Sequence, residues 1–204
     1  TLLDSTRAIV SAIQASCRDM GVPEPTDFDA KQVIGLGLLE AMRHSAPALS
    51  EDQIPAMADR YRHHYFGRDH ELATFDGINE LLAELHNEGF LLAIATGKGR
   101  VGLNRALEYC GFGHLFSATR CGDECFSKPH PQMLEELIDE FAASKERTLM
   151  VGDTTHDLQM AVNAGVAGLG VSYGAHPVEA LHSLKPLACV RDVRELDEWL
   201  DLNA

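Results

Sequence analysis

Two carboxylates four residues apart carry the strongest chemical signal in the sequence. Asp153 and Asp157 belong to the string GDTTHD at positions 152–157. Asp153 follows an apolar run that suits a buried strand, and Asp157 falls on the first turn of the next expected helix. Mg²⁺ prefers hard oxygen ligands, so the pair predicts a Mg²⁺ site. The alternative is structural: Asp153 caps the helix and Asp157 favours its positive end.

A hydroxyl and a glycine follow another apolar run. Thr96 comes directly after residues 90–95, and Gly97 lets backbone N–H groups approach an anion. The pair can hold a phosphoryl group, so Thr96 is predicted as catalytic and substrate-binding, and Gly97 as substrate-binding. A simple turn with a threonine helix cap is the alternative. Lys98, next in the chain, is predicted to be a solvated surface charge.

A lysine stands before two prolines in the string SKPHP at positions 127–131. The prolines restrict the loop and start the next helix. Lys128 can therefore present its ammonium group to a phosphate as a point charge, and it is predicted as a catalytic and substrate-binding residue. Alone, a lysine before proline is most often a surface residue. His130 and His156 adjoin these motifs and are predicted to be flanking rather than catalytic histidines.

These groups need elements that bring them together. From about residue 76 short apolar runs alternate with amphipathic helical patterns, and strands are expected near 90–95, 115–118, 148–151, 168–172 and 187–190. This order predicts an α/β fold with a doubly wound parallel sheet and helices on both faces. The carboxyl ends of such strands meet at one edge, where open sheets bind ligands.

Residues 13–75 show a different pattern from the rest of the chain. Helical patterns cover positions 33–42 and 54–65, and nothing there resembles a buried strand. We therefore expect a core formed by residues 1–12 and 76–204, with residues 13–75 as an inserted or appended helical subdomain that acts as a lid.

The composition limits the function class. The 204 residues are 45% hydrophobic and 24% charged, as in a globular protein with a real core. The net charge of −14 argues against partners such as nucleic acid or anionic membranes. The longest apolar run, 90–95, is too short to span a bilayer. Five cysteines without disulfide or metal-site spacing indicate reduced thiols and a cytoplasmic location.

Together the three motifs resemble those of the haloacid dehalogenase superfamily. Thr96 matches its second motif, Lys128 its third, and Asp153 with Asp157 its fourth. The opening TLLDS at 1–5 is similar to the segment directly after the Asp-x-Asp-Gly of its first motif. Within the superfamily, the SKP and GDTTHD strings and IGLGL at 34–38 look most like phosphoglycolate phosphatases.

The resemblance implies a Rossmann-like core with a helical cap of the C1 type inserted after the first strand. It implies an aspartate nucleophile just before Thr1 that forms an aspartyl-phosphate, with a second aspartate as acid and base. Mg²⁺ and Lys128 would neutralise the phosphoryl oxygens, and Thr96 would donate to one of them. Asp153 would ligate the metal, and Asp157 would ligate through water or orient the neighbouring ligands. The implied activity is Mg²⁺-dependent hydrolysis of small phosphomonoesters.

Two further functions stay open. A phosphosugar mutase of the same fold would return the phosphoryl group to its substrate, and a non-catalytic protein of this fold would only bind. The joint presence of the four motif residues argues against the second. The expected partner is a small phosphorylated metabolite, and the chain is expected to be a monomer or homodimer. We also expect roughly ten residues before Thr1 that form the central strand of the sheet.

Overall fold

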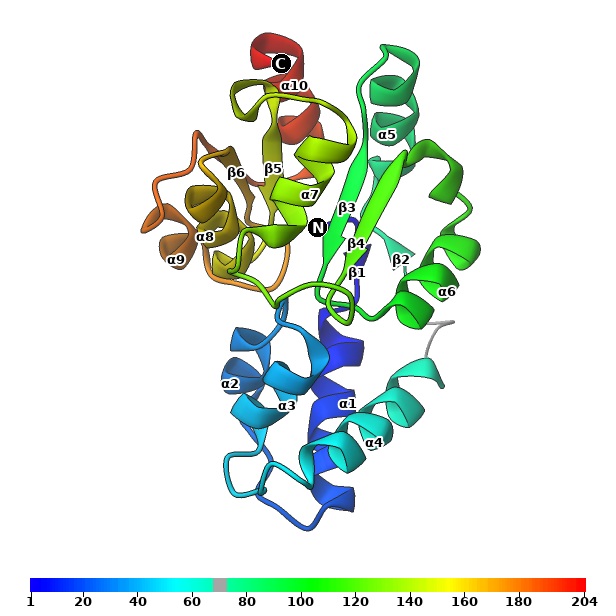
Figure 1. Ribbon diagram of the computed structural model, residues 1–204, viewed down its shortest axis with the longest axis vertical. Helices are drawn as coiled ribbons and strands as arrows, with labels where there is room; N and C mark the ends of the chain where they lie inside the picture. The colour runs from blue at the N-terminus through cyan, green and yellow to red at the C-terminus, as the bar shows by residue number, and fades with distance from the viewer. Residues whose placement is uncertain (68–72) are drawn as a thin grey trace.

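The computed structural model describes residues 1–67 and 73–204, and these form a helical block and an α/β body (Figure 1). The helical block comprises α1 (Thr6–Asp19), α2 (Asp27–Gln32), α3 (Leu38–Ser45) and α4 (Ile54–Phe66). Apolar positions four residues apart, such as Ile9, Ile13 and Cys17, give α1 one apolar face. This face packs with residues of α3 and α4, including the fully buried Met42 and Met57, in a single cluster. The block therefore has its own apolar core.

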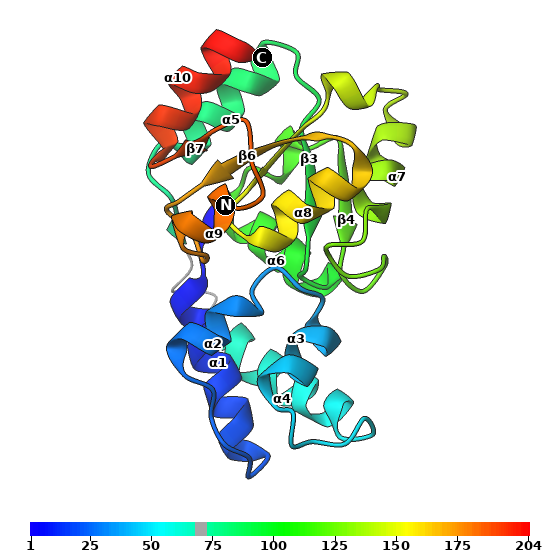
Figure 2. The same ribbon diagram turned by 90° about the vertical axis from the view of Figure 1, so that its left-hand side faces the viewer.

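The α/β body contains parallel strands covered by helices on two faces (Figure 2). Its strands are β3 (Ala93–Thr96), β4 (Ala118–Cys121), β5 (Leu149–Gly152), β6 (Ala167–Val171) and β7 (Cys189–Val190). Its helices are α5 (Ile78–Asn87), α6 (Arg100–Cys110), α7 (Gln132–Glu140), α8 (Thr155–Ala164), α9 (Val178–His182) and α10 (Val193–Asn203), with short 3-10 turns at Gly113–Leu115 and Lys145–Arg147. The α/β class predicted from the sequence is confirmed.

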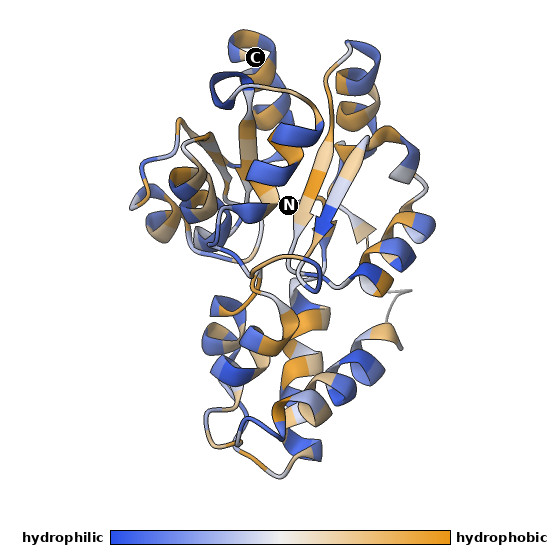
Figure 3. Cartoon of the chain, in the orientation of Figure 1, coloured by the Kyte–Doolittle hydropathy of each residue, from blue (hydrophilic) through white to orange (hydrophobic). Residues whose placement is uncertain are grey.

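Alternation along β5 distributes its side chains between the two faces. Met150 packs in a cluster with α7 and α8, whereas Leu149 and Val151 pack in a second cluster with α5, β6 and α10. Successive residues of a strand point to opposite faces, so a short apolar run can serve two helix layers. This explains why β5 is continuously hydrophobic, and Figure 3 shows the same for β3.

The parallel strands fall into two groups. β3 pairs with β4, and β6 pairs with both β5 and β7, but no pairing between β3 and β5 occurs among the described residues. A cavity of about 1870 Å³ is lined by both strands and continues between the body and the helical block. Apolar side chains such as Ile94, Leu137 and Trp199 line it within the body. We refer to this part of the cavity as the β3–β5 groove.

Several predicted boundaries are corrected by the structure. The strand expected from residue 90 begins at Ala93, because Gly89, with φ of +91°, ends α5 and Phe90 still bonds back to Leu85. The strand expected at 115–118 is β4, which begins at Ala118 after the 3-10 turn.

The entry to the helical block is a two-stranded antiparallel ribbon. In it β1 (Leu3–Asp4) pairs with β2 (Ala73–Thr74). Helix α1 runs unbroken through the predicted boundary between residues 12 and 13, so the ribbon is a more natural division than that boundary. The division into core and cap itself stays a prediction. None of the helices in the described residues has the length and hydrophobicity that a membrane span requires.

Candidate active site

The predicted site residues all line the same cavity, where strands of the body end. Thr96 is the last residue of β3, Lys128 lies between β4 and α7, and Asp153 directly follows β5. Gly97 and Asp157 line the cavity beside them. The structure therefore brings together the five residues that the sequence motifs singled out.

Lys128 is a buried cation that spans the gap between β3 and α8. Its Nζ donates to Asp157 Oδ1 at 2.6 Å and to the carbonyl oxygen of Ala95 at 2.8 Å. Lys128 and Asp157 are each only 4% exposed. The alternative of a surface lysine is therefore wrong. A buried charge is tolerated only with such partners, so the pair fixes the ammonium group at the end of β3.

Asp157 uses both carboxylate oxygens within the protein. Its Oδ1 accepts from Lys128, and its Oδ2 accepts from the backbone N–H and the hydroxyl of Thr154, at 3.1 and 2.7 Å. The Asp157 N–H in turn donates to the Thr154 hydroxyl, which completes a capping box at the start of α8. The structural alternative made Asp153 the cap of α8, and this is wrong because the cap is Thr154. These contacts favour an orienting role for Asp157 over direct metal ligation.

Asp153 is a buried carboxylate held from two sides. Its Oδ1 accepts from the Thr1 hydroxyl at 2.6 Å and lies 2.7 Å from the Thr1 nitrogen, and its Oδ2 accepts from the Ala175 N–H at 2.8 Å. Burial raises the pKa of Asp153, whereas the hydrogen bonds from the Thr1 hydroxyl and the Ala175 N–H lower it. A side chain at Gly174 would place its Cβ 2.1 Å from Asp153 Oδ2. Asp153 is therefore a carboxylate oxygen donor in a tight backbone cradle.

The loop between α2 and α3 (residues 33–37, the α2–α3 loop) covers the site from the helical block. A Cβ on Gly97 would lie 2.3 Å from the Leu36 carbonyl oxygen, so only glycine allows this approach. The Gly37 N–H donates to Ser127 Oγ at 2.8 Å, next to Lys128. A Cβ on Gly35 would lie 2.8 Å from Thr154 Oγ1. The loop therefore contacts all three motif segments of the body.

A second contact between the body and the helical block is formed by Lys98, whose role the sequence did not reveal. Lys98 Nζ donates to the Tyr65 hydroxyl at 2.5 Å and lies 4.5 Å from the centre of that ring. The prediction of a solvated surface charge at Lys98 is wrong, because Tyr65 from α4 covers it. Thr96, two residues before, accepts from the Lys98 N–H through its hydroxyl at 3.1 Å. The turn after β3 is thus tied to the helical block.

Residues 1–171 match the haloacid dehalogenase-like hydrolase family. The chain belongs to this family. It is 34% identical over 202 residues to a protein of Dickeya dadantii named probable phosphatase IndB, covering 96% of this chain and 87% of the relative. It is also 30% identical to the phosphoglycolate phosphatase of Vibrio cholerae, covering 100% of this chain and 94% of that one. The family match and these relatives show that this haloacid dehalogenase-like protein is a phosphatase, as its motifs predicted.

The fold agrees with solved structures of such hydrolases. A hydrolase from Pseudomonas syringae superposes with a TM-score of 0.91 at 20% identity, covering 100% of this chain and 95% of that one. At this identity the match shows a shared fold. The Rossmann-like core expected from the resemblance is confirmed.

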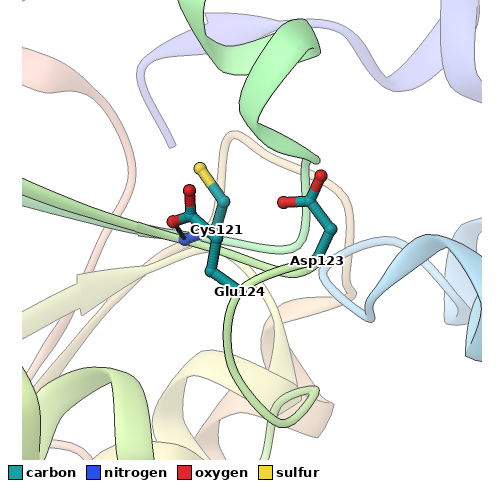
Figure 4. A group of neighbouring side chains, drawn as sticks. All are labelled: Cys121, Asp123 and Glu124. Carbon is teal, nitrogen blue, oxygen red and sulfur yellow. Dashed lines mark hydrogen bonds between the residues drawn. The ribbon is translucent and has the colours of Figure 1, made fainter.

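One other group of potential ligands lies at the end of β4 in this haloacid dehalogenase-like protein (Figure 4). Cys121, Asp123 and Glu124 approach one another there, but each has another partner or is protonated. Glu124 pairs with Arg100 at 2.6 Å, and Asp123 accepts from the Arg100 N–H at 3.0 Å. Burial raises the pKa of the Cys121 thiol to about 12, so it stays a thiol at neutral pH. The group is better explained as a structural network around Arg100 than as a metal site.

The sequence motifs missed the residues that join the site to the helical block. Tyr65 and His176 lie 33 and 145 residues from their partners Lys98 and Lys31, so no local spacing connects them. The one available signal was position, since His176 belongs to the segment that follows β6, at the same edge of the sheet as Asp153.

Proposed function

We propose that the protein is a Mg²⁺-dependent phosphatase of small phosphomonoesters that works through an aspartyl-phosphate. The observation that carries this is the buried Lys128–Asp157 pair beside the buried Asp153, all lining a cavity covered by the α2–α3 loop. Positive charge fixed next to oxygen ligands, in a place closed to bulk water, is what phosphoryl transfer needs. Phosphatases of this family generally use a divalent metal ion.

The residues present fit such a metal. Asp153 would hold Mg²⁺, because it supplies hard oxygens and is held in place by the Ala175 N–H. Asp157 would keep Lys128 in place rather than ligate. When bound, the metal would add positive charge at the oxygens of the transferred group. Lys128 would neutralise a further oxygen, and the Thr96 hydroxyl would donate to another.

The nucleophile and the acid/base aspartate are proposed to lie on a strand just before Thr1. The β3–β5 groove supports this, since it is apolar and β3 and β5 each present an edge without a partner strand among the described residues. A parallel strand there would satisfy the backbone N–H and C=O groups of both edges. Its carboxyl end would reach Asp153 and Lys128, because parallel strands end at the same edge of a sheet.

The substrate class is proposed as small phosphorylated acids, on the similarity to the phosphoglycolate phosphatase of Vibrio cholerae. A relative of Halalkalibacterium halodurans, 27% identical over 205 residues, is named a pyrophosphatase, so pyrophosphate is the competing substrate. The mutase alternative of the same fold predicts an isomerised sugar phosphate and no free phosphate.

A phosphate-release assay on the complete protein tests the proposal. Phosphoglycolate, pyrophosphate and a hexose phosphate would each be offered with Mg²⁺ and again after exhaustive chelation, with Asp153→Asn as the matched control. We expect release that requires the metal and is fastest for phosphoglycolate, and a loss of about 10²-fold or more in Asp153→Asn. A rapid-quench sample should gain the mass of one phosphoryl group. Undiminished turnover after chelation would refute the metal dependence, and isomerised sugar without phosphate would favour the mutase.

A further inference from the structure

Two histidines of the body reach the last turn of α2 in the helical block. His156 Nε2 lies 2.9 Å from the carbonyl oxygen of Gln32, and His176 Nε2 lies 3.1 Å from that of Lys31. The two rings are 5.3 Å apart and nearly perpendicular, at 71°. A carbonyl oxygen only accepts, so each Nε2 must carry a hydrogen and donate it. The two imidazoles therefore form neighbouring bonds across the junction.

The tautomer of His176 is fixed from its other side. Its Nδ1 accepts from the Thr155 backbone N–H at 3.1 Å, and a backbone N–H can only donate. His176 is therefore a neutral imidazole with its hydrogen on Nε2, aimed at α2. Only 3% of the residue is exposed, so water competes little for this bond.

The carbonyl groups that accept from these histidines belong to the last two residues of α2, where a helix has few backbone donors of its own. Lys31 O already accepts from the backbone N–H groups of Val33 and Ile34, whereas the donor to Gln32 O is His156. Carbonyls at a helix end need such outside donors. The body thus supplies what the end of α2 lacks, and the α2–α3 loop begins at the next residue.

Each histidine is attached to one of the two aspartates of the site. His156 directly precedes Asp157 on α8. His176 follows Ala175, whose N–H holds Asp153 Oδ2, and the His176 N–H itself donates to the Asp153 carbonyl oxygen at 3.2 Å. A shift of α2 relative to the body would therefore pull on the two segments that place the carboxylates.

We propose that His156 and His176 are positioning residues that dock the end of α2 and so hold the α2–α3 loop over Gly97, Ser127 and Thr154 during turnover. The docking stands on the contacts alone, and only its consequence for catalysis rests on the proposed function. Both histidines act through the loop and not on substrate. The device needs a hydrogen-bond donor at each position.

Paired substitutions distinguish a donor from a mere space-filler. His156→Leu and His176→Leu remove the donors, whereas His156→Gln and His176→Gln keep an N–H at the reach of Nε2. His86→Leu, on an exposed position of α5, is the matched control. Hydrogen exchange of the backbone amides at 34–38 reports docking directly, and KM and kcat for phosphoglycolate report its effect on turnover. Circular dichroism verifies that each variant is folded.

We expect each leucine variant to speed exchange at 34–38 by about three- to tenfold, the effect of one hydrogen bond. KM should rise by a similar factor with a smaller change in kcat, because the loop closes less often around bound substrate. The glutamine variants should recover most of both effects, and the control should change neither. Unchanged exchange in a folded double leucine variant would overturn the docking, as would glutamine variants that behave like leucine. If the unaltered protein released no phosphate while exchange still responded, the proposed function would fail and the docking would stand.

Discussion

The helical block and the α/β body complete their interiors in different ways. In the block, α1 to α4 satisfy most backbone hydrogen bonds internally and bury a shared apolar cluster, with a smaller one between α1 and α4. In the body, two clusters lie on opposite faces of the parallel strands. A helix needs only an apolar stripe to pack, but a central strand needs neighbours on both sides. The block is therefore defined by its own segment, whereas the body depends on distant pairings.

The largest effect is expected at Lys128, which joins the two halves of the body. Lys128→Met removes the partner of a buried carboxylate, so the free energy of unfolding should fall by about 3–5 kcal/mol. It also removes the fixed charge, so kcat/KM should fall by about 10²-fold or more. Denaturant titration and phosphate release measure the two effects. Adding Asp157→Asn should restore stability without restoring activity. Wild-type kcat/KM in Lys128→Met would contradict the role assigned to the lysine.

Replacing one fully buried side chain in each region with alanine tests whether the block and the body have independent cores. Met57 of α4 and Leu169 of β6 are both fully buried, and replacing either with alanine should cost about 2–5 kcal/mol. The costs should appear in different places. Met57→Ala should speed hydrogen exchange in α1 and α3, with β5 and β6 still protected. Leu169→Ala should do the reverse. Faster exchange in β5 and β6 of Met57→Ala would mean that the block has no independent core.

The smallest effect concerns the boundary between the regions. Gly97→Ala puts a methyl group on the Leu36 carbonyl oxygen, so the α2–α3 loop must lift and KM should rise by about tenfold. Gly102→Ala is the matched control. It lies inside α6, and the nearest atom to its added Cβ would be 3.6 Å away on Phe66. That change should leave KM alone and raise stability by about 0.5–1 kcal/mol. A Gly97→Ala enzyme with normal KM would show that the loop does not cover the working site.

The sequence could place the candidate residues at one edge of the sheet because each stands at the end of a locally recognisable element. Thr96 and Asp153 follow apolar runs, and Lys128 is set by its prolines, so the motif order alone placed them at one edge. The sequence left open whether Asp157 binds metal or stabilises the positive end of the next helix. That choice depends on Thr154 and on Lys128, which lies 29 residues away, and their contacts with its two oxygens favour orientation.

Contacts between the two regions were beyond the reach of the sequence. Lys98 looked like a surface charge because nothing near it in the chain covers it, and Tyr65 arrives from the other region. His176 carries no motif, and its partner carbonyl at Lys31 belongs to the backbone, which leaves no trace in residue type. Strand starts shifted for a similar reason, since strand ends are set by pairing partners and apolar runs extend past them.

The narrow ribbon of β1 and β2 allows segments of different length between its two strands. Because Leu3 faces Thr74 and Asp4 faces Ala73, the chain leaves and re-enters the body at adjacent points. Adjacent strands of such a pair lie about 5 Å apart, so whatever is spliced between them meets the same closed end. Closing a longer insert adds little entropy cost, since that cost grows only with the logarithm of its length. A longer or shorter segment between β1 and β2 would therefore leave the strand order of the body the same.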